Sequence, residues 1–393
     1  MVFVGLCHRV SCLRVRPGIL SGIWHSQGRL PFDVAEAGIP LHTPIGLAFL
    51  YSLRAIYHKA FGKSAPEENK LMKIIRILGV VIGILIVSFL IHEVGWPKIE
   101  HSLGMLGWGY ILVIAYPMTW ILLNTGGWRM AFHAQYAKIR LLDLAQIRLA
   151  GETFNSLLPS GYIGGEPLKA KLLARWIPDH EAASSVLIAK AAQSIGLVLF
   201  VGLGLIFGGN RGHASVAHHP KTIAALILLT GGIATFTVLL TRRSFSRLGR
   251  WLHDLTGHPW LQKQETKLVA LDDSIGAFYR EGKGRFLGSV LWHVGGWTAG
   301  ALEVALIFFL IGHRVDWRQA WFIGAMAQLA SVIGLFAPAG VGLYEGGHYL
   351  AASILGISPA LGVSVALIRR VREIFWDLVG LILFWKLSNT ESQ

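Results

Sequence analysis

The chain has 393 residues, of which 53% are hydrophobic and only 15% are charged, and its mean hydropathy is +0.53. A soluble domain carries about 25% charged residues, so the composition excludes an ordinary soluble protein. It predicts an all-α polytopic membrane protein. The net charge is +14, and we assign it to Lys- and Arg-rich cytoplasmic loops rather than to nucleic-acid binding. The expected partner is therefore membrane lipid, with no nucleic acid.

Residues 1–71 differ from the rest of the chain because they contain no apolar run long enough to cross a bilayer. The segment Met72-Lys-Ile-Ile-Arg76 directly precedes a clean apolar run. We therefore hypothesise that Met72 is the natural start and that residues 1–71 are an upstream extension, disordered or loosely attached. The alternative is a genuine cytoplasmic arm. Residues 72–386 form the predicted transmembrane domain, and residues 387–393 a cytoplasmic tail.

Six segments are long and apolar enough to be clear spanning helices. They are residues 74–91, 106–123, 185–207, 223–240, 286–311 and 360–385. Pro117 lies inside the second and predicts a kink there. Two further segments, 141–159 and 320–336, each lead into a Pro- and Gly-rich stretch and then a short helical piece. They are predicted to be broken or re-entrant segments.

The Pro- and Gly-rich stretch occurs twice, 179 positions apart. The first copy reads Pro159-Ser-Gly161-Tyr-Ile-Gly-Gly165-Glu166, and the second reads Pro338-Ala-Gly340-Val-Gly342-Leu-Tyr-Glu345. The repeated sequence extends over residues 148–207 and 327–386, and Asn155 precedes the first break. Such a break could be a turn at the membrane surface. It could also expose free backbone N–H groups that hold an anion such as a lipid phosphate.

The distribution of Lys and Arg predicts the orientation of the chain. Basic residues concentrate before residue 74 and in the loop 241–285, which places both, and the C-terminus, in the cytoplasm. Three predicted helices then separate the two breaks. If both breaks are re-entrant, the repeats have inverted topology, with a site near the midplane between them. If each broken segment crosses fully, the repeats are parallel.

The repeated carboxylates and cations are candidate head-group ligands. Glu166 and Glu345 could be first-turn acids with a structural role, or they could take up a proton or pair with basic residues. Each is followed, 24 positions later, by a cation, Lys190 or Arg369. Pairing of each carboxylate with the cation 24 positions later is therefore one of the alternatives.

The segment Arg369-Arg-Val-Arg372-Glu373 begins about nine residues into an apolar span. A lipid-facing arginine costs about 2.5–3.5 kcal/mol at the centre of a helix, so these side chains must face a polar interior. Arg369 and Glu373 have i,i+4 spacing and can pair. The alternative readings are a structural ion-pair network and a site for an anionic head group. We favour the second because the nearby acids are too few to neutralise the cations, and because arginine suits phosphate.

Glu303 lies in the middle of the span 286–311. It is a candidate coupling carboxylate, or it forms a hydrogen bond to another helix. The sequence contains no phosphate-binding GxxxxGK[ST] loop, no GxSxG motif and no HExxH motif. No catalytic residue, metal site or cofactor is therefore predicted.

The sequence from Arg148 to Lys169 resembles the first signature of the lysylphosphatidylglycerol synthase transmembrane-region family, also described as flippase-like. The segment from Pro338 to Glu345, followed by Arg369, resembles its second signature. The similarity covers residues 72–386, and the family includes membrane proteins of hopanoid gene clusters. In full-length synthases a C-terminal soluble domain transfers the aminoacyl group, and the membrane region moves the lipid product. The resemblance therefore implies lipid translocation rather than synthesis.

We accordingly expect a lipid flippase or transporter of the bacterial inner membrane and no enzyme activity. In this hypothesis Lys190, Arg369 and Arg372 hold an anionic head group, and Glu166 and Glu345 tune those cations. The alternatives are an integral-membrane enzyme that modifies a lipid head group, and an accessory subunit that binds lipid-biosynthesis enzymes.

Overall fold

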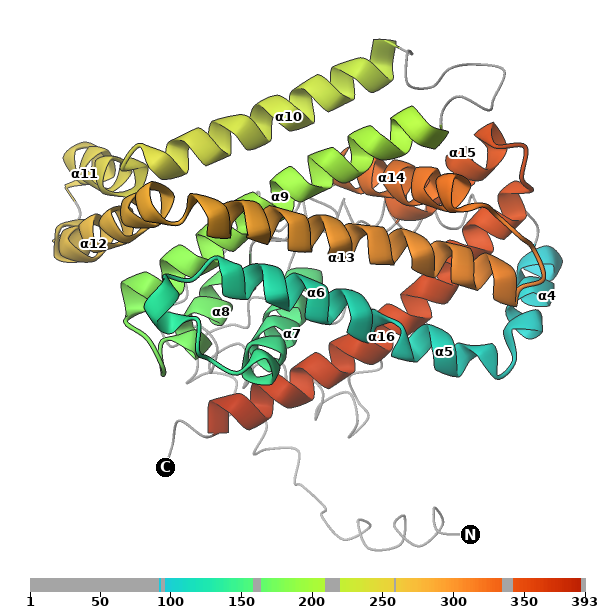
Figure 1. Cartoon of the computed structure of the whole chain (residues 1–393), viewed down its shortest axis with the longest axis horizontal. Coiled ribbons are helices and arrows are strands. Elements are labelled where there is room, and N and C mark those ends of the chain that lie inside the picture. The colour runs from blue at the N-terminus through green and yellow to red at the C-terminus, as the bar shows by residue number, and fades with distance from the viewer. Residues whose placement is uncertain are drawn as a thin grey trace, which may run out of the picture. The chain divides into compact units, whose positions relative to one another are not determined.

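The computed structural model describes residue 92 and residues 96–157, 164–208, 220–257, 259–333 and 342–389. All regular structure within these residues is helical (Figure 1). The chain divides into two units, Met1–Lys70 and Leu71–Gln393, and the described residues all belong to the second. Residues 1–71 and the predicted span 74–91 lie outside the described residues, so the hypothesis about Met72 stays a prediction.

The helices follow one another along the described residues in the order labelled in Figure 1. They are α4 (Trp96–Leu106), α5 (Gly109–Ala115), α6 (Pro117–Met130), the short 3-10 helix η2 (Ala134–Tyr136), α7 (Leu141–Leu157), α8 (Glu166–Leu173), α9 (Asp179–Gly208), α10 (Pro220–Thr241), α11 (Ser244–Thr256), α12 (Pro259–Glu281), α13 (Lys283–Leu310), α14 (Trp317–Ile333), α15 (Leu343–Ile354) and α16 (Pro359–Asn389).

Three stretches of the described chain are long and apolar enough to cross a membrane: Gly109–Met130, Asp179–Ile206 and Lys283–Leu310. The pair Leu226–Thr241 and Ser244–Thr256 is long and apolar enough only when its two helices are taken together, and it is bent by 85°. The first consists of α5 and α6, which meet at Tyr116 because Pro117 begins a new helix, as the predicted kink requires. α16 is 31 residues long, but the charged residues in its middle keep it out of this apolar group.

The two segments around the repeated motif form helices as predicted. α7 and α14 lead into the motif, and the short helices α8 and α15 follow it. Glu166 and Glu345 lie in the first turns of α8 and α15. The motif residues Pro159, Gly161, Pro338 and Gly340 lie outside the described residues, and so their predicted role in the helix break stays a prediction.

The offset of 179 positions relates whole helices as well as motif residues. Adding 179 carries α9 onto residues 358–387, which coincide with α16, and carries α8 onto 345–352, which lie within α15. It also carries α7 onto 320–336, which overlap α14, and residues 109–130 of α5 and α6 onto 288–309 of α13. The coincidence of helix bounds at this offset therefore begins earlier in the chain than the sequence similarity, because residues of α13 correspond to those of α5 and α6.

α6 and α13 pack closely because glycines face large side chains across the contact. A Cβ added at Gly126 would lie 3.0 Å from the ring of Trp292, and one added at Gly127 would lie 2.8 Å from Nε2 of His293. The Ser289 hydroxyl donates to the carbonyl of Gly127 at 2.8 Å. Small residues that allow two backbones to approach are typical of helix contacts in membranes.

Two further helix contacts also join one half to the other. α7 packs on α16, where Phe154 meets Phe384 with ring centroids 5.0 Å apart and the Ser156 hydroxyl donates to Oδ2 of Asp377 at 3.0 Å. α9 packs on α14, where Nε1 of Trp321 donates to the carbonyl of Phe200 at 2.9 Å. At the offset of 179, α7 corresponds to α14 and α9 corresponds to α16, so these two contacts are equivalent. Each half therefore contributes one helix to each contact.

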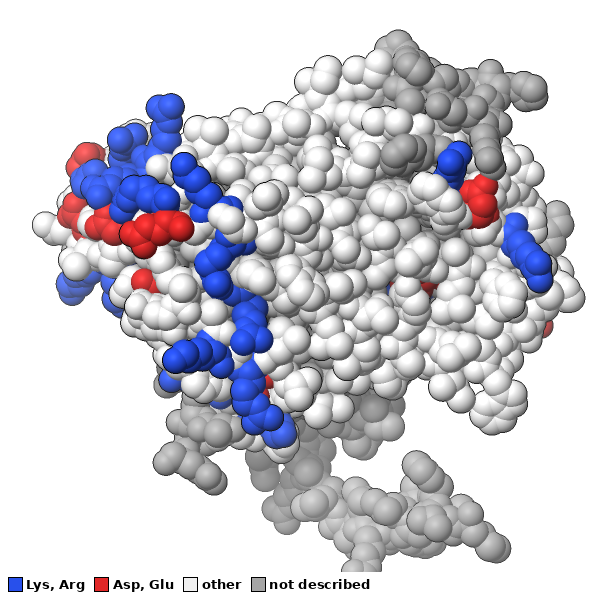
Figure 2. Space-filling view, viewed as in Figure 1, with Lys and Arg blue, Asp and Glu red and all other residues white. Residues whose placement is uncertain are grey.

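The surface is divided by charge. Figure 2 shows Lys and Arg gathered at the end of the molecule where α11 and α12 lie, whereas the middle of the visible face carries few charges. Large apolar side chains are exposed on several helices, among them Ile227 and Leu228 of α10 and Leu291 of α13. A face with few charges and exposed apolar side chains are suited to contact with lipid tails.

Candidate functional site

The first charged cluster lies at the start of α8. Glu166 and Lys169 come from α8, Lys190 comes from the middle of α9, and Arg148 and Glu152 come from α7. Glu166, Lys169 and Arg148 are buried. Three elements therefore bring ionised side chains together because the short helix α8 packs between α7 and α9.

The cations and carboxylates of this cluster form a continuous chain of ion pairs. Nζ of Lys190 lies 3.1 Å from Oε1 of Glu166. Nζ of Lys169 lies 3.2 Å from Oε2 of Glu166 and 2.8 Å from Oε1 of Glu152. Nη2 of Arg148 lies 3.2 Å from the same Glu152 oxygen. The predicted pairing of Glu166 with Lys190 is confirmed.

Asn155 links the backbone just before α8 to the charged cluster by hydrogen bonds. Its Nδ2 donates to Oε1 of Glu166 at 3.2 Å and to Oε2 of Glu152 at 3.1 Å, while its Oδ1 accepts from the backbone N–H of Gly165 at 2.7 Å. A Cβ added at Gly165 would collide with the carbonyl oxygen of Gly151. The break motif thus uses Asn155 for its hydrogen bonds and a glycine for close approach.

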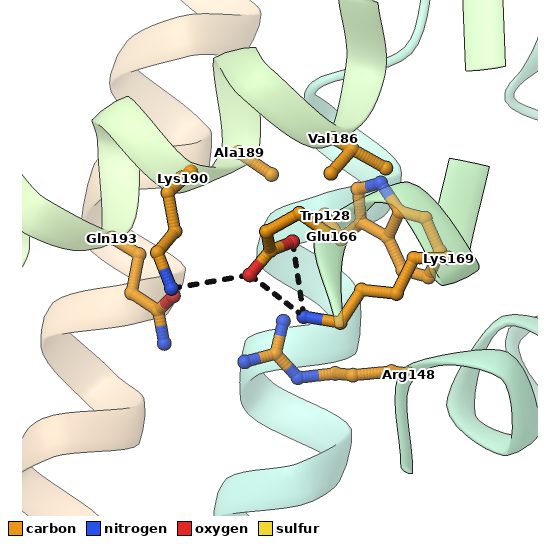
Figure 3. Close-up of a pocket in the computed structure, with 8 residues that line it drawn as sticks. All are labelled: Trp128, Arg148, Glu166, Lys169, Val186, Ala189, Lys190 and Gln193. Atoms are coloured by element: carbon orange, nitrogen blue, oxygen red, sulfur yellow. Dashed lines mark hydrogen bonds and ion pairs between the residues drawn. The ribbon is translucent and has the colours of Figure 1, made fainter. Parts of the chain in front are cut away.

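A pocket with an empty volume of about 210 Å³ opens beside these ion pairs (Figure 3). Its lining consists of Trp128, Arg148, Glu166, Lys169, Val186, Ala189, Lys190 and Gln193. The side chain of Lys190 is 22% exposed, the largest value among the cluster's cations. Nε of Arg148 is buried and has no hydrogen-bond partner among the described residues.

The second charged cluster lies at the start of α15. Oε2 of Glu345 accepts from the backbone N–H of Gly342 at 2.7 Å, and its Oε1 accepts from Nε of Arg370 at 2.6 Å. Gly342 has φ of 86°, a backbone conformation that favours glycine. Gly342 and Glu345 therefore start α15 in a fixed geometry, which is a structural role for this part of the motif.

The arginines of α16 are held by carboxylates from three helices. Nη1 of Arg372 donates to Oε1 and Oε2 of the fully buried Glu303 on α13, at 2.6 and 2.7 Å. Nη2 of Arg369 lies 3.3 Å from Oε2 of Glu303. Glu373 pairs with Arg370 at 2.8 Å and with Arg372 at 3.3 Å.

Two possible pairings of Arg369 are not the ones found in this cluster. The sequence allowed Arg369 to pair with Glu345 or with Glu373, but it pairs with Glu303. Its neighbour Arg370 holds both other carboxylates. Successive helical residues point about 100° apart, so the choice between Arg369 and Arg370 depends on the rotation of α16, which a repeat offset does not reveal.

The sequence predicted too few carboxylates for the arginines of α16, and this expectation is also corrected. In the second cluster, three arginines meet the three carboxylates Glu303, Glu345 and Glu373. In the first, the ion pairs between described residues join Arg148, Lys169 and Lys190 to Glu152 and Glu166. The structure brings Lys190 into the first cluster and Arg369 and Arg372 into the second, and no ion pair between described residues joins the two clusters.

Sequence reasoning missed Arg148 and Glu152 as members of a site. Their i,i+4 spacing within the half-apolar α7 was the available signal. It also missed that Glu303 corresponds to Asn124 of α6 in the 179-residue offset. Asn124 is buried too, and its Oδ1 lies 2.7 Å from Nδ1 of His293.

Buried ion pairs between apolar helices of spanning length define a multi-pass α-helical membrane protein. Residues 76–379 match the family described as the lysylphosphatidylglycerol synthase TM region, and the chain belongs to this family. It is also similar to a UPF0104 membrane protein of Methanothermobacter thermautotrophicus, with 22% identity over 326 residues that cover 79% of this chain and 91% of the relative. No solved structure matches. The predicted family is thus confirmed.

Proposed function

We propose that this protein handles or translocates a membrane lipid with an anionic head group, and that the first cluster holds that head group. The observation that carries the proposal is the gathering of three cations at one pocket. Arg148, Lys169 and Lys190 line it together with Glu166, and the buried Nε of Arg148 has no hydrogen-bond partner among the described residues, which is costly for a buried donor. A bound phosphate oxygen would accept a hydrogen bond from that donor.

The donors in the pocket suit a phosphate oxygen. Nε of Arg148 is buried without a partner among the described residues, and Lys190 is the most exposed cation of the cluster. The pocket is small and lies beside these donors. In this proposal the head-group phosphate binds at the pocket, and the acyl or polyterpenoid tails stay in the bilayer.

The second cluster has a different role in this proposal. Its arginines are matched by carboxylates, so it locks α13, α15 and α16 together and leaves the head group to the first cluster. Glu303 acts as the partner of Arg372 rather than as a free coupling carboxylate. Glu166 tunes the cations of the first cluster because it contacts both Lys169 and Lys190.

We further propose that the two halves form an inverted repeat in the inner membrane. Nη2 of Arg175, just before α9, donates to the carbonyl of Leu387, near the end of α16, and Figure 1 shows α9 and α16 running in opposite directions. α6 and α13 are also antiparallel, because Gly109 lies against Leu310 while Arg285 donates to Phe132. Inverted repeats with a site between them occur in many transporters.

The charge distribution supports an orientation of the protein in the membrane. The basic end with α11 and α12 faces the cytoplasm of a bacterial cell, and the end of α16 lies on the same side. The protein moves its lipid without a chemical step. Enzymes that make or modify that lipid are the expected protein partners.

A reconstituted transport assay tests this function. Purified protein is placed in vesicles that contain fluorescent phosphatidylglycerol, and the fraction that reaches the outer leaflet is followed with a membrane-impermeant quencher. The wild-type protein is expected to accelerate the exchange. Lys190→Gln and Arg148→Gln are expected to slow it several-fold, because each removes a donor from the pocket.

Lys171→Gln is the matched control, because Lys171 is an exposed cation on the same helix α8. It should leave the rate unchanged. Equal rates for wild-type protein and Lys190→Gln would remove the proposed site. Chemical conversion of the lipid by purified protein would favour an enzyme. Transport that requires a co-purified partner would favour an accessory subunit.

A further inference from the structure

α11 leaves the transmembrane region at a sharp corner that is stabilised by specific contacts. It follows the span Leu226–Thr241 at an angle of 85°. Arg243 at the corner has φ of 52° and forms an ion pair with Asp273. The buried carboxylate of Asp272 accepts from the backbone N–H groups of Phe245 at 3.3 Å and Ser246 at 2.8 Å. The perpendicular direction of α11 is thus fixed by α12.

The two faces of α11 have different surroundings. Ser246 and Gly249 are buried, and Gly249 lies against Leu268 of α12. On the opposite face Leu248, Trp251 and Leu255 are 52%, 59% and 68% exposed. Their spacing of three and four residues places them in one stripe along the helix. Large apolar side chains therefore cover the side of α11 that no other described helix covers.

Basic side chains lie on one side of the apolar stripe. Arg247 and Arg250 are exposed on α11. Arg250 pairs at 3.4 Å with Glu265 of α12, but both side chains of this pair are about half exposed, at 53% and 44%. The segment 241–285 contains nine Lys and Arg residues against five Asp and Glu residues, and Figure 2 shows this end as the most basic part of the visible face.

We propose that α11 lies in the head-group layer of the membrane and binds its anionic lipids. If α10 crosses the bilayer, a helix at 85° to it runs along the membrane surface. The stripe of Leu248, Trp251 and Leu255 then enters the boundary between head groups and tails, and Arg247 and Arg250 contact lipid phosphates. An exposed apolar stripe beside basic residues is the composition of helices that bind membrane surfaces. This contact is independent of the pocket beside Lys190.

Site-directed spin labelling measures the depth of α11 directly. The background replaces the two cysteines, as Cys7→Ser and Cys12→Ser, and single labels are introduced with Leu248→Cys or Leu255→Cys. Asp254→Cys provides the matched control, because Asp254 is exposed on the polar side of the same helix. The protein is reconstituted in vesicles of phosphatidylcholine with or without phosphatidylglycerol, and collisions with oxygen and with a water-soluble nickel chelate are compared.

We expect labels at 248 and 255 to collide several-fold more with oxygen, relative to the nickel chelate, than the label at 254. The difference should increase when phosphatidylglycerol is present and fall when Arg247→Gln and Arg250→Gln are added. Labels at 248 and 255 that are as accessible to the chelate as the label at 254 would overturn the proposal. Immobile labels shielded from both reagents would also overturn it, because they indicate contact with a second copy or another protein.

Discussion

Lys190 on α9 pairs with Glu166 on α8 at 3.1 Å, but Arg369, which occupies the position of Lys190 in the second half, does not pair with Glu345. Arg370 holds Glu345 instead, at 2.6 Å, and Arg369 is directed to Glu303. One half therefore presents its cations to a pocket, and the other uses them to hold helices together. Because the two halves differ in this way, substitutions of neighbouring charged residues are expected to have different effects on stability.

Arg370→Gln should destabilise the protein more than Arg369→Gln. Loss of Arg370 leaves the buried carboxylate of Glu345 with only the N–H of Gly342, whereas loss of Arg369 leaves Glu303 bound to Arg372. Breaking a buried ion pair by removing one partner costs about 3–5 kcal/mol. Thermal unfolding in detergent measures the order of the two variants. The reverse order would contradict the observed pairing.

Glu303→Gln should be more damaging than Glu373→Gln. Glu303 is fully buried and pairs with both Arg372 and Arg369, while the side chain of Glu373 is 35% exposed. The expected loss for Glu303→Gln is again about 3–5 kcal/mol in the free energy of unfolding. Chemical denaturation of the two variants in the same detergent checks this, and equal losses would argue against a lock centred on Glu303.

Gly165→Ala should prevent correct folding, whereas Gly346→Ala should be neutral or slightly stabilising. A Cβ at Gly165 would collide with backbone atoms of Gly151, but nothing lies within 4 Å of a Cβ added at Gly346. Alanine is favoured over glycine in a helix by up to about 1 kcal/mol. Size-exclusion chromatography of the two purified variants gives the yield of folded protein. A normal yield of Gly165→Ala would show that the backbone segments at Gly151 and Gly165 can move apart to accommodate a Cβ.

The inverted repeat predicts opposite sides for two equivalent residues. Asp179 begins α9, Ser358 directly precedes α16, and both are exposed. In a background without Cys7 and Cys12, cysteines placed at these two positions should react with an impermeant thiol reagent from opposite sides of sealed vesicles. Reaction from the same side would show that the repeats are parallel.

The sequence predicted those helices that are marked by an apolar run within their own residues. α9, α10 and α13 appear where apolar runs were found, within a few residues of the expected bounds. The helix starts at Glu166 and Glu345 were also predictable, because proline, glycine and a first-turn acid are local signals. The correspondence of α13 to α5 and α6 could not be predicted from the sequence, because their side chains differ. It becomes visible only in the lengths and contacts of the helices.

The members of the two clusters were only partly predictable. Lys190 and Glu166 were found because both lie within one half and recur at the same offset. The partnership of Arg372 with Glu303 spans 69 positions and depends on how α13 packs near α16, which no local pattern encodes. Arg148 and Glu152 escaped notice because an i,i+4 pair is common on exposed helices, and only the tertiary structure shows that Arg148 is buried.

The charges in the middle of α16 also constrain how the protein is made. Each arginine costs about 2.5–3.5 kcal/mol at the centre of an isolated inserted helix, so α16 cannot enter the bilayer favourably by itself. Its counterions Glu303 and Glu345 lie on α13 and α15, which are synthesised earlier. We therefore expect α16 to insert together with α13 and α15, so that its arginines are paired with these carboxylates as they leave water.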